Sequence, residues 1–239
     1  MTVLTSPDPA ALATAVARRL LDRLAEVQAG GGIPHIALTG GTIADAIHRE
    51  VARLSRGSAV DWSRVELWWG DERYVARADP DRNAGQARKA LLDHVDVAAD
   101  RVHEMPASDA GYPDVDAAAA AYGDEVRRDG AGRFDVVMLG VGPDGHVASL
   151  FPGFPQLDVD DRIAVGVTGS PKPPPERISL TFPTLERTRS VWFVVAGSGK
   201  AAAVARAVGG ADPHEVPAAR PHGAEETLWM VDAAAASGL

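Results

Sequence analysis

The sequence predicts an α/β fold built on a parallel or mostly parallel sheet with helices on both faces. Short apolar runs typical of buried strands alternate with segments of helical period along the chain, and this alternation is typical of a parallel sheet. The composition supports a globular core, because 46% of the 239 residues are hydrophobic and 24% are charged. We expect residues 1–239 to form a single domain, which could include a small subsidiary lobe.

In the first half of the chain, strand and helix patterns follow one another closely. Residues 33–38 predict a short buried strand, and the segment after it repeats apolar residues at helical spacing. An alanine run further on favours a helix, since alanine has the highest helix propensity. The predicted elements of this half are strands at 33–38, 65–69 and 102–105 and helices at 42–54, 83–95 and 117–128.

The second half is richer in strands. Residues 134–139 form the clearest buried-strand pattern in the chain. The run from Pro171 to Pro175 is too short for an inter-domain linker and predicts a stiff, extended loop. The other predicted elements of this half are strands at 162–168, 177–181, 191–196 and 227–231 and a helix at 201–208.

Charge and composition exclude several classes of function. Lysine and arginine number 24 against 33 acidic residues, so the net charge is −9, which disfavours nucleic-acid and anionic-membrane partners. The absence of cysteine excludes disulfides, thiolate catalysis and cysteine-bound zinc. The longest apolar run, at 191–196, is far shorter than the roughly 20 residues of a membrane helix. We therefore expect a cytoplasmic protein, with a monomer slightly favoured.

Three motifs match known cofactor or metal patterns only in part. Residues 140–145 read G-x-G-x-x-G, but prolines at 152 and 155 leave no room for the helix that a dinucleotide site requires. Residues 197–200 resemble the end of a P-loop, yet Val194 and Ala201 stand where the pattern needs glycine and a hydroxyl. His103-Glu104 lacks the second histidine of a zinc helix. We expect neither a cofactor nor a metal.

The chemistry is expected in the loops that follow the strands, because ligands of open α/β sheets bind outside the carboxyl ends of the strands. Four predicted strands are followed at once by glycine or polar residues, at positions 39, 70, 140 and 197. In the first loop, Gly40, Gly41 and Thr42 precede a helix and could cradle a phosphate with free backbone N–H groups. The same residues could also form a plain turn with Thr42 as the helix cap.

The other loops supply charged side chains and one histidine. Arg73 could hold a phosphate or sugar oxygen and Asp71 could orient a hydroxyl, although a surface ion-pair cluster is an equally good interpretation. His146 follows a glycine-rich turn and is well placed to act as a general base, with Asp144 close enough to fix its tautomer or shape the turn. Arg177 and Lys200 lie beside strand ends, where ordinary surface cations are also common.

These residues lie in motifs that resemble one known family. The motifs occur in the family's order and span nearly the whole chain, and they are Thr39-Gly40-Gly41-Thr42, Trp69-Gly70-Asp71-Glu72-Arg73, the run from Gly140 to Pro152 and the run from Lys172 to Ser179. The chain resembles the 6-phosphogluconolactonases, whose superfamily also holds glucosamine-6-phosphate deaminases and isomerases. The resemblance implies a Rossmann-like three-layer sandwich with a mostly parallel central sheet.

The resemblance also implies an activity and a set of site residues. The activity is hydrolysis of 6-phospho-D-glucono-1,5-lactone to 6-phosphogluconate in the pentose phosphate pathway, with His146 as general base. Asp71 and Arg73 then line the sugar side of the site. The implied phosphate site consists of Gly40, Gly41, Thr42, Arg177 and Lys200. Many family members carry serine where Thr42 stands, a change that keeps the hydroxyl.

Two other functions stay open at this stage. A sugar-phosphate deaminase or isomerase of the same fold is the nearer alternative, but that branch carries Asn-Glu where Leu150-Phe151 stand here. The second alternative is a sugar-phosphate sensor without catalysis. In every case the expected partner is a small sugar phosphate.

Overall fold

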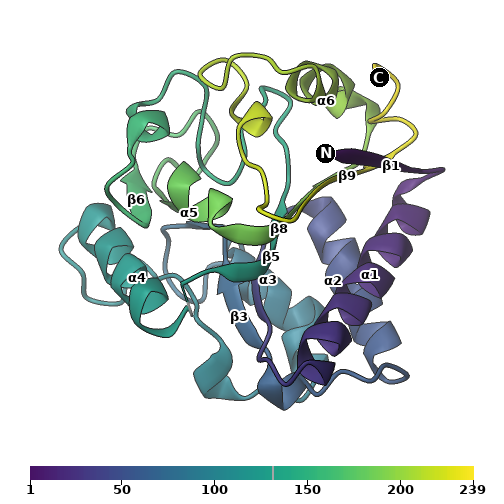
Figure 1. Cartoon of the computed structure of the whole chain (residues 1–239). Coiled ribbons are helices and arrows are strands. Elements are labelled where there is room, and N and C mark those ends of the chain that lie inside the picture. Colours follow the sequence, from purple (N-terminus) through teal and green to yellow (C-terminus); the bar gives the residue numbers. More distant parts are fainter. Residues whose placement is uncertain (131) are drawn as a thin grey trace.

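The centre of the protein is a six-stranded sheet whose strands all run parallel, as Figure 1 shows for the computed structural model, which describes residues 1–130 and 132–239. The strand order is β1-β9-β8-β5-β2-β3. Their bounds are Thr2–Ser6 (β1), His35–Leu38 (β2), Glu66–Trp69 (β3), Phe134–Leu139 (β5), Thr188–Val195 (β8) and Glu226–Asp232 (β9). β2 and β8 read as near-continuous apolar runs because both faces of the sheet are covered.

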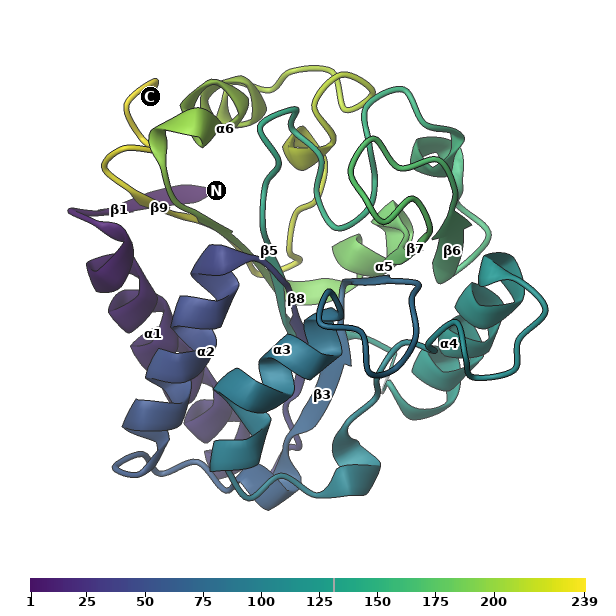
Figure 2. The same cartoon turned by 180° about the vertical axis from the view of Figure 1, so that it is seen from behind.

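Helices cover the two faces of the sheet. Figure 2 shows α1, α2 and α3 together on one side, and α4, α5 and α6 lie on the other side. Their bounds are Pro9–Ala29 (α1), Thr42–Ser55 (α2), Asn83–Ala90 (α3), Val115–Asp129 (α4), Phe182–Glu186 (α5) and Ala201–Val208 (α6). The fold is thus a three-layer α/β sandwich, which confirms the predicted class.

A second, three-stranded sheet stands beside the central one. Its strands are antiparallel, in the order β4-β7-β6, with bounds Asp71–Arg73 (β4), Arg177–Leu180 (β7) and Ala164–Val167 (β6). Gly70 joins the two sheets, because its N–H donates to the carbonyl of Leu38 in β2 and its carbonyl accepts from Leu180 in β7. This junction carries Asp71 and Arg73 from the end of β3 directly into the second sheet.

The chain order places a switch point between β2 and β5. From β2 the chain proceeds outward to β3, whereas from β5 it proceeds the other way to β8 and β9. Loops that leave two such neighbouring strands diverge and leave a crevice between them, which is where ligands bind in folds of this kind. The loops after Leu38 and Leu139 flank this crevice.

Several element predictions need correction. The first 30 residues, for which no elements were predicted, form β1 and the long helix α1, which Asp8 caps by accepting from the N–H of Ala11. The strand expected at 102–105 is wrong, because only Val102 makes a bridge, to Leu67, before the chain turns away. The helix expected at 83–95 ends at Ala90 and is followed by a single 3₁₀ turn over Leu92–His94.

The strands expected at 162–168 and 177–181 exist in shortened form, but they belong to the second sheet. Their apolar residues resemble those of central strands because this sheet is also buried. The proline-rich segment from Pro171 to Pro175 forms the loop between these two strands. Among the described residues, no helix combines the length and apolar character needed to cross a bilayer.

Candidate active site

A polar pocket of about 250 Å³ opens at the carboxyl ends of β2 and β5, beside the second sheet. It draws residues from six separate segments of the chain. The lining consists of Thr39, Gly40, Gly41, Asp71, Arg73, Asn83, Gly140, Val141, Gly142, His146, Ala148, Lys172, Pro173, Arg177 and Lys200. Segments up to 160 residues apart in sequence therefore meet here, because parallel strands end at the same edge of the sheet.

His146 stands on a double turn that follows β5. The N–H of Gly142 donates to the carbonyl of His146, and the N–H of Gly145 donates to the carbonyl of Gly142. Gly145 has φ 87°, a conformation that favours glycine. A side chain at Gly142 would collide with the ring of His146 and with the carboxylate of Asp144. Glycine at this position therefore lets both side chains lie against the turn.

Asp144 fixes the orientation of the imidazole. Its Oδ1 lies 2.6 Å from His146 Nδ1, so Nδ1 carries the proton and Nε2 is the basic nitrogen. Burial opposes ionisation of Asp144, but the hydrogen bond and attraction from His146, together with Lys172, outweigh it and lower the pKa of Asp144 to about 2. The carboxylate is therefore ionised at neutral pH and can stabilise a protonated His146.

Asp71 is buried at the edge of the pocket, and one of its carboxylate oxygens is bound within the protein. Its Oδ2 accepts a hydrogen bond of 2.7 Å from the hydroxyl of Ser149, which is itself fully buried. The N–H of Ser149 donates to the hydroxyl of Ser179, the residue paired with Asp71 across β4 and β7. These bonds tie the His146 loop to the second sheet. Ala148, which precedes Ser149, lines the pocket and has φ 48°, a strained conformation for a residue other than glycine.

Arg73 is held by Asn83 at its side chain and by Glu72 at its backbone. Its guanidinium donates to the side-chain oxygen of Asn83, whose amide donates in turn to the carbonyl of Asp71. The buried Glu72 accepts from the backbone N–H groups of Arg73, Asn83 and Ala84 and so fixes the start of α3. Burial raises the pKa of Glu72, although Arg82 and these three N–H groups oppose the shift.

The turn after β2 brings backbone close to these side chains. A side chain at Gly40 would collide with Asn83 and Arg73, so only glycine fits there. Gly41 has φ 101° and precedes α2, whose first N–H groups face this region. Thr42, which begins α2, lies in an adjoining apolar groove that also includes Gly40, Gly41 and Lys200. The predicted phosphate cradle is therefore divided between the polar pocket and this groove.

Three cations complete the pocket, and they are Lys172 from the proline-rich loop, Arg177 from the start of β7 and Lys200 just before α6. Arg177 donates from Nε and Nη2 to the carbonyls of Pro174, Lys172 and Pro173, which leaves Nη1 to bind a ligand. Lys172 places Nζ 3.9 Å from Asp144. Lys200 donates to the carbonyl of Val141 at 2.7 Å, and burial, reinforced by Lys172, lowers its pKa.

The pocket is positively charged within an acidic chain. Four cationic side chains line it against the single carboxylate of Asp71, and Asp144 stands behind His146, so its formal charge is 4 − 2 = +2. A net charge of −9 therefore does not prevent this edge of the sheet from attracting a small anion.

The structure brings together nearly all of the residues that the sequence singled out. Seven of them line the pocket, Asp144 contacts His146 from behind, and Thr42 lies in the adjoining groove. Sequence reasoning missed Asn83 and Lys172. Lys172 stands in the same motif as Arg177 and could have been found there, whereas Asn83 carried no signal because its place depends on the buried Glu72.

Comparison with known proteins now decides the family. The profile described as glucosamine-6-phosphate isomerases/6-phosphogluconolactonase matches residues 7–229. The chain belongs to this family. It is similar to a 6-phosphogluconolactonase of Streptomyces coelicolor, with 47% identity over 97% of this chain and 92% of that protein.

Solved structures of the family share the fold. The chain is similar to the 6-phosphogluconolactonase from Thermotoga maritima, with a TM-score of 0.85, 24% identity and coverage of 97% of this chain and 99% of that one. It is equally similar in fold to a monomeric glucosamine-6-phosphate deaminase, with a TM-score of 0.85, 20% identity and full coverage of both chains. Because both enzymes have this fold, the fold alone does not distinguish lactonase from deaminase.

Proposed function

We propose that this chain is an enzyme that hydrolyses 6-phospho-D-glucono-1,5-lactone to 6-phospho-D-gluconate. The observation that carries the proposal is the Asp144–His146 pair, 2.6 Å apart, at the side of a pocket lined by four cations. The identity of 47% to a named 6-phosphogluconolactonase over almost the whole chain supports lactonase over deaminase.

His146 activates the attacking water in this proposal. Its Nε2 takes a proton from the water as the oxygen attacks C1 of the lactone, and ionised Asp144 stabilises the imidazolium that forms. Backbone N–H groups or Arg73 meet the developing oxyanion. The imidazolium then returns its proton to the ring oxygen as the C1–O bond breaks. General-base action of this kind contributes about 10²–10⁴-fold to the rate.

The phosphate end of the substrate fixes its position. The Gly40–Gly41 turn and the N-terminus of α2 offer backbone N–H groups, and Arg177 and Lys200 offer charge. These groups bind oxygens that take no part in the reaction. Binding energy at the phosphate can therefore hold C1 of the lactone next to His146. The reacting groups are then already in position, so the reaction avoids the entropy cost of a bimolecular encounter.

Turnover of freshly made 6-phosphogluconolactone tests the proposal, with spontaneous hydrolysis subtracted and unphosphorylated gluconolactone as the control substrate. We expect fast hydrolysis of the phosphorylated lactone and a much lower kcat/KM for the control. Substantial release of ammonia from glucosamine 6-phosphate would contradict the lactonase assignment. Binding of 6-phosphogluconate without any turnover would indicate a sensor.

Two substitutions test the role of the catalytic pair. His146→Ala should lower kcat by about 10²–10⁴-fold while 6-phosphogluconate still binds, because the phosphate contacts remain. Asp144→Asn keeps the shape but removes the negative charge that stabilises the imidazolium, so kcat should fall while KM changes little. Wild-type turnover in His146→Ala would remove His146 from this role.

We further propose that the enzyme acts as a monomer in the cytoplasm, with no nucleic-acid or membrane partner. Residues of one chain bring together the catalytic pair and the four cations on which the proposed mechanism depends, which supports the monomer. Light scattering coupled to size-exclusion chromatography, run at the concentration used for activity, should give one chain mass near 25.0 kDa. A dimer that loses activity on dilution would contradict the monomer.

A further inference from the structure

A second cluster of chemically reactive side chains lies at the amino end of β3, away from the pocket at its carboxyl end. At its centre is His103, which is buried and sits in the segment between α3 and α4. Glu66, the first residue of β3, and Glu125, from α4, reach its two ring nitrogens. The proposed hydrolysis uses none of these residues.

The imidazole of His103 is held rigidly. Its ring stacks on Trp68, with ring centres 3.7 Å apart and planes 7° from parallel. Its Nε2 lies 2.9 Å from Glu66 Oε2, and the other oxygen of Glu66 accepts from Arg101. A carboxylate that accepts a hydrogen bond from one ring N–H fixes the tautomer and makes the other nitrogen a better ligand, as in carboxylate–histidine–metal sites.

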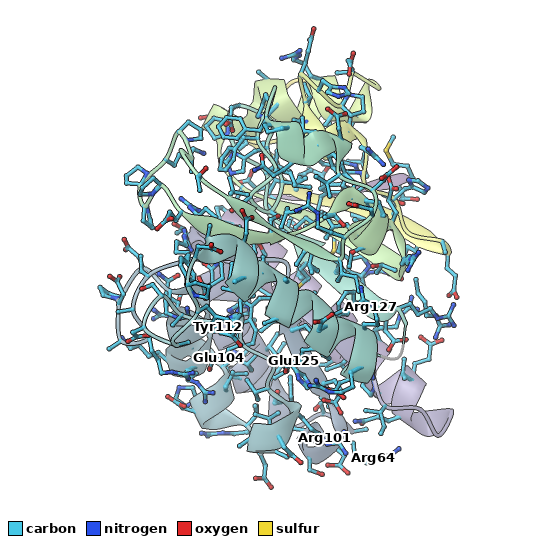
Figure 3. The ribbon with its side chains drawn as sticks, turned by 90° about the vertical axis from the view of Figure 1, so that its left-hand side faces the viewer. Arg64, Arg101, Glu104, Tyr112, Glu125 and Arg127 are labelled. Atoms are coloured by element: carbon cyan, nitrogen blue, oxygen red, sulfur yellow. The ribbon has the colours of Figure 1, made fainter. Side chains whose placement is uncertain are left out.

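The other ring nitrogen contacts a carboxylate of α4, and a second carboxylate of that helix lies nearby. Glu125 Oε1 lies 2.7 Å from His103 Nδ1, and Asp129 stands one helical turn further on the same helix. One ligand atom from each of these three residues lies within 4.8 Å of the others. Figure 3 shows Glu125 on the edge of α4 that faces Arg101, whereas Arg127 lies on the opposite edge.

We propose that His103, Glu125 and Asp129 form a binding site for one divalent transition-metal ion, best suited to zinc, with Glu66 as the residue that orients His103. One imidazole and two carboxylates are ligands that zinc accepts at about 2.0–2.2 Å, and small side-chain movements bring the three atoms to that range. Asp129 is partly exposed, so water can occupy a remaining position. The site links α4 to the segment around His103.

The neighbouring charges are compatible with a bound cation. Glu66, Glu125 and Asp129 contribute three negative charges around one imidazole, while Arg101 and Arg128 contribute two positive charges. Arg128 and Asp129 form an exposed pair, and exposed pairs contribute little stability, so Asp129 can turn toward a metal at small cost. The imidazole nitrogen that would bind the ion already lies 2.7 Å from Glu125 Oε1.

Calorimetric titration of the chelator-stripped protein with ZnCl₂ at pH 7.5 tests the site. We expect one high-affinity equivalent in the wild type and a loss of affinity of at least about 10-fold in Asp129→Asn, which removes an exposed ligand and should fold normally. Asp124→Asn is the matched control, because Asp124 is an exposed carboxylate of the same helix that pairs with Arg127 as Asp129 pairs with Arg128. Its affinity should equal that of the wild type.

Histidine NMR signals give an independent readout that does not depend on activity. The chain has seven histidines, and Co²⁺ at one equivalent should shift or broaden the ring signals of His103 selectively. His214 serves as the internal control, because its two aspartate partners lie at opposite ring nitrogens and do not converge. The site is refuted if the wild type binds no zinc below 1 mM, if Asp129→Asn binds like the wild type, if both aspartate variants lose affinity equally, or if Co²⁺ affects His214 first.

Discussion

The buried histidine of α2 should make this protein lose stability in mild acid. His48 is 3% exposed, and its Nε2 has no hydrogen-bond partner among residues 1–130 and 132–239. Burial lowers the pKa of His48 to about 4, against an ordinary value of 6.5, and nearby Asp45 opposes this shift only in part. The folded state thus excludes a proton that the unfolded chain binds. The free energy of unfolding therefore falls as the pH drops from 6.5 toward 4.

The two pKa values of His48 set the size of this loss. Linkage between protonation and folding gives a contribution of about 2 kcal/mol between pH 7 and pH 5, and about 3 kcal/mol by pH 4. His48→Leu fills similar space with an apolar side chain that does not titrate. The variant should therefore lose about 2 kcal/mol less than the wild type between pH 7 and pH 5.

Urea unfolding followed by far-UV circular dichroism at pH 7, 6 and 5, at one ionic strength, measures this difference. Comparing the change with pH within each protein cancels any constant effect of the leucine on packing. His222→Leu replaces an exposed histidine and should keep the pH dependence of the wild type. Parallel curves for His48→Leu and the wild type would refute the reasoning, because His48 would then bind its proton equally well in both states.

Three further predictions concern the pocket. Gly40→Ala places a methyl group against the side chains of Asn83 and Arg73. We expect kcat/KM to fall at least about 10-fold and the free energy of unfolding to fall by about 1–3 kcal/mol. Wild-type values of both quantities would show that these side chains move aside freely. Ser149→Ala leaves the buried carboxylate of Asp71 without its hydroxyl partner. The free energy of unfolding measured in urea should therefore fall by about 1–3 kcal/mol, and steady-state kinetics should show a lower kcat. An unchanged unfolding midpoint and an unchanged kcat would mean that this hydrogen bond contributes nothing. Dialysis against a chelator should leave lactonase activity unchanged, because the proposed hydrolysis needs only His146 and water, and recovery that depended on added metal would contradict it.

The sequence can place a candidate side chain at the pocket where that side chain lies close to a strand end. Gly40, Asp71 and His146 each follow a buried apolar run directly, and parallel strands bring their carboxyl ends to one edge. Lys200 also follows such an end, that of β8, whereas Arg177 is the first residue of β7 in the second sheet. Local sequence is informative for the residues that follow central strands because they lie only two to seven residues beyond the strand end.

Residues placed by long-range contacts could not be predicted in this way. Asn83 reaches the pocket because Glu72, eleven residues earlier, binds its backbone in a buried site. The second sheet was missed as a separate unit because burial on both faces gives its strands the composition of central strands. The surroundings of His103 were likewise not predicted, because the two carboxylates that contact its ring, Glu66 and Glu125, lie 37 and 22 residues away along the chain.

The sequence by itself determined the fold class, the family and seven of the fifteen residues that line the pocket, because apolar periodicity and short motifs are properties of neighbouring residues. Only the tertiary structure decided how these residues act together. It placed Asp144 2.6 Å from Nδ1 of His146 and the hydroxyl of Ser149 2.7 Å from Asp71, and it showed that an acidic chain carries a positive pocket. Those facts depend on distances between segments far apart in the chain, which packing sets and which no local pattern encodes.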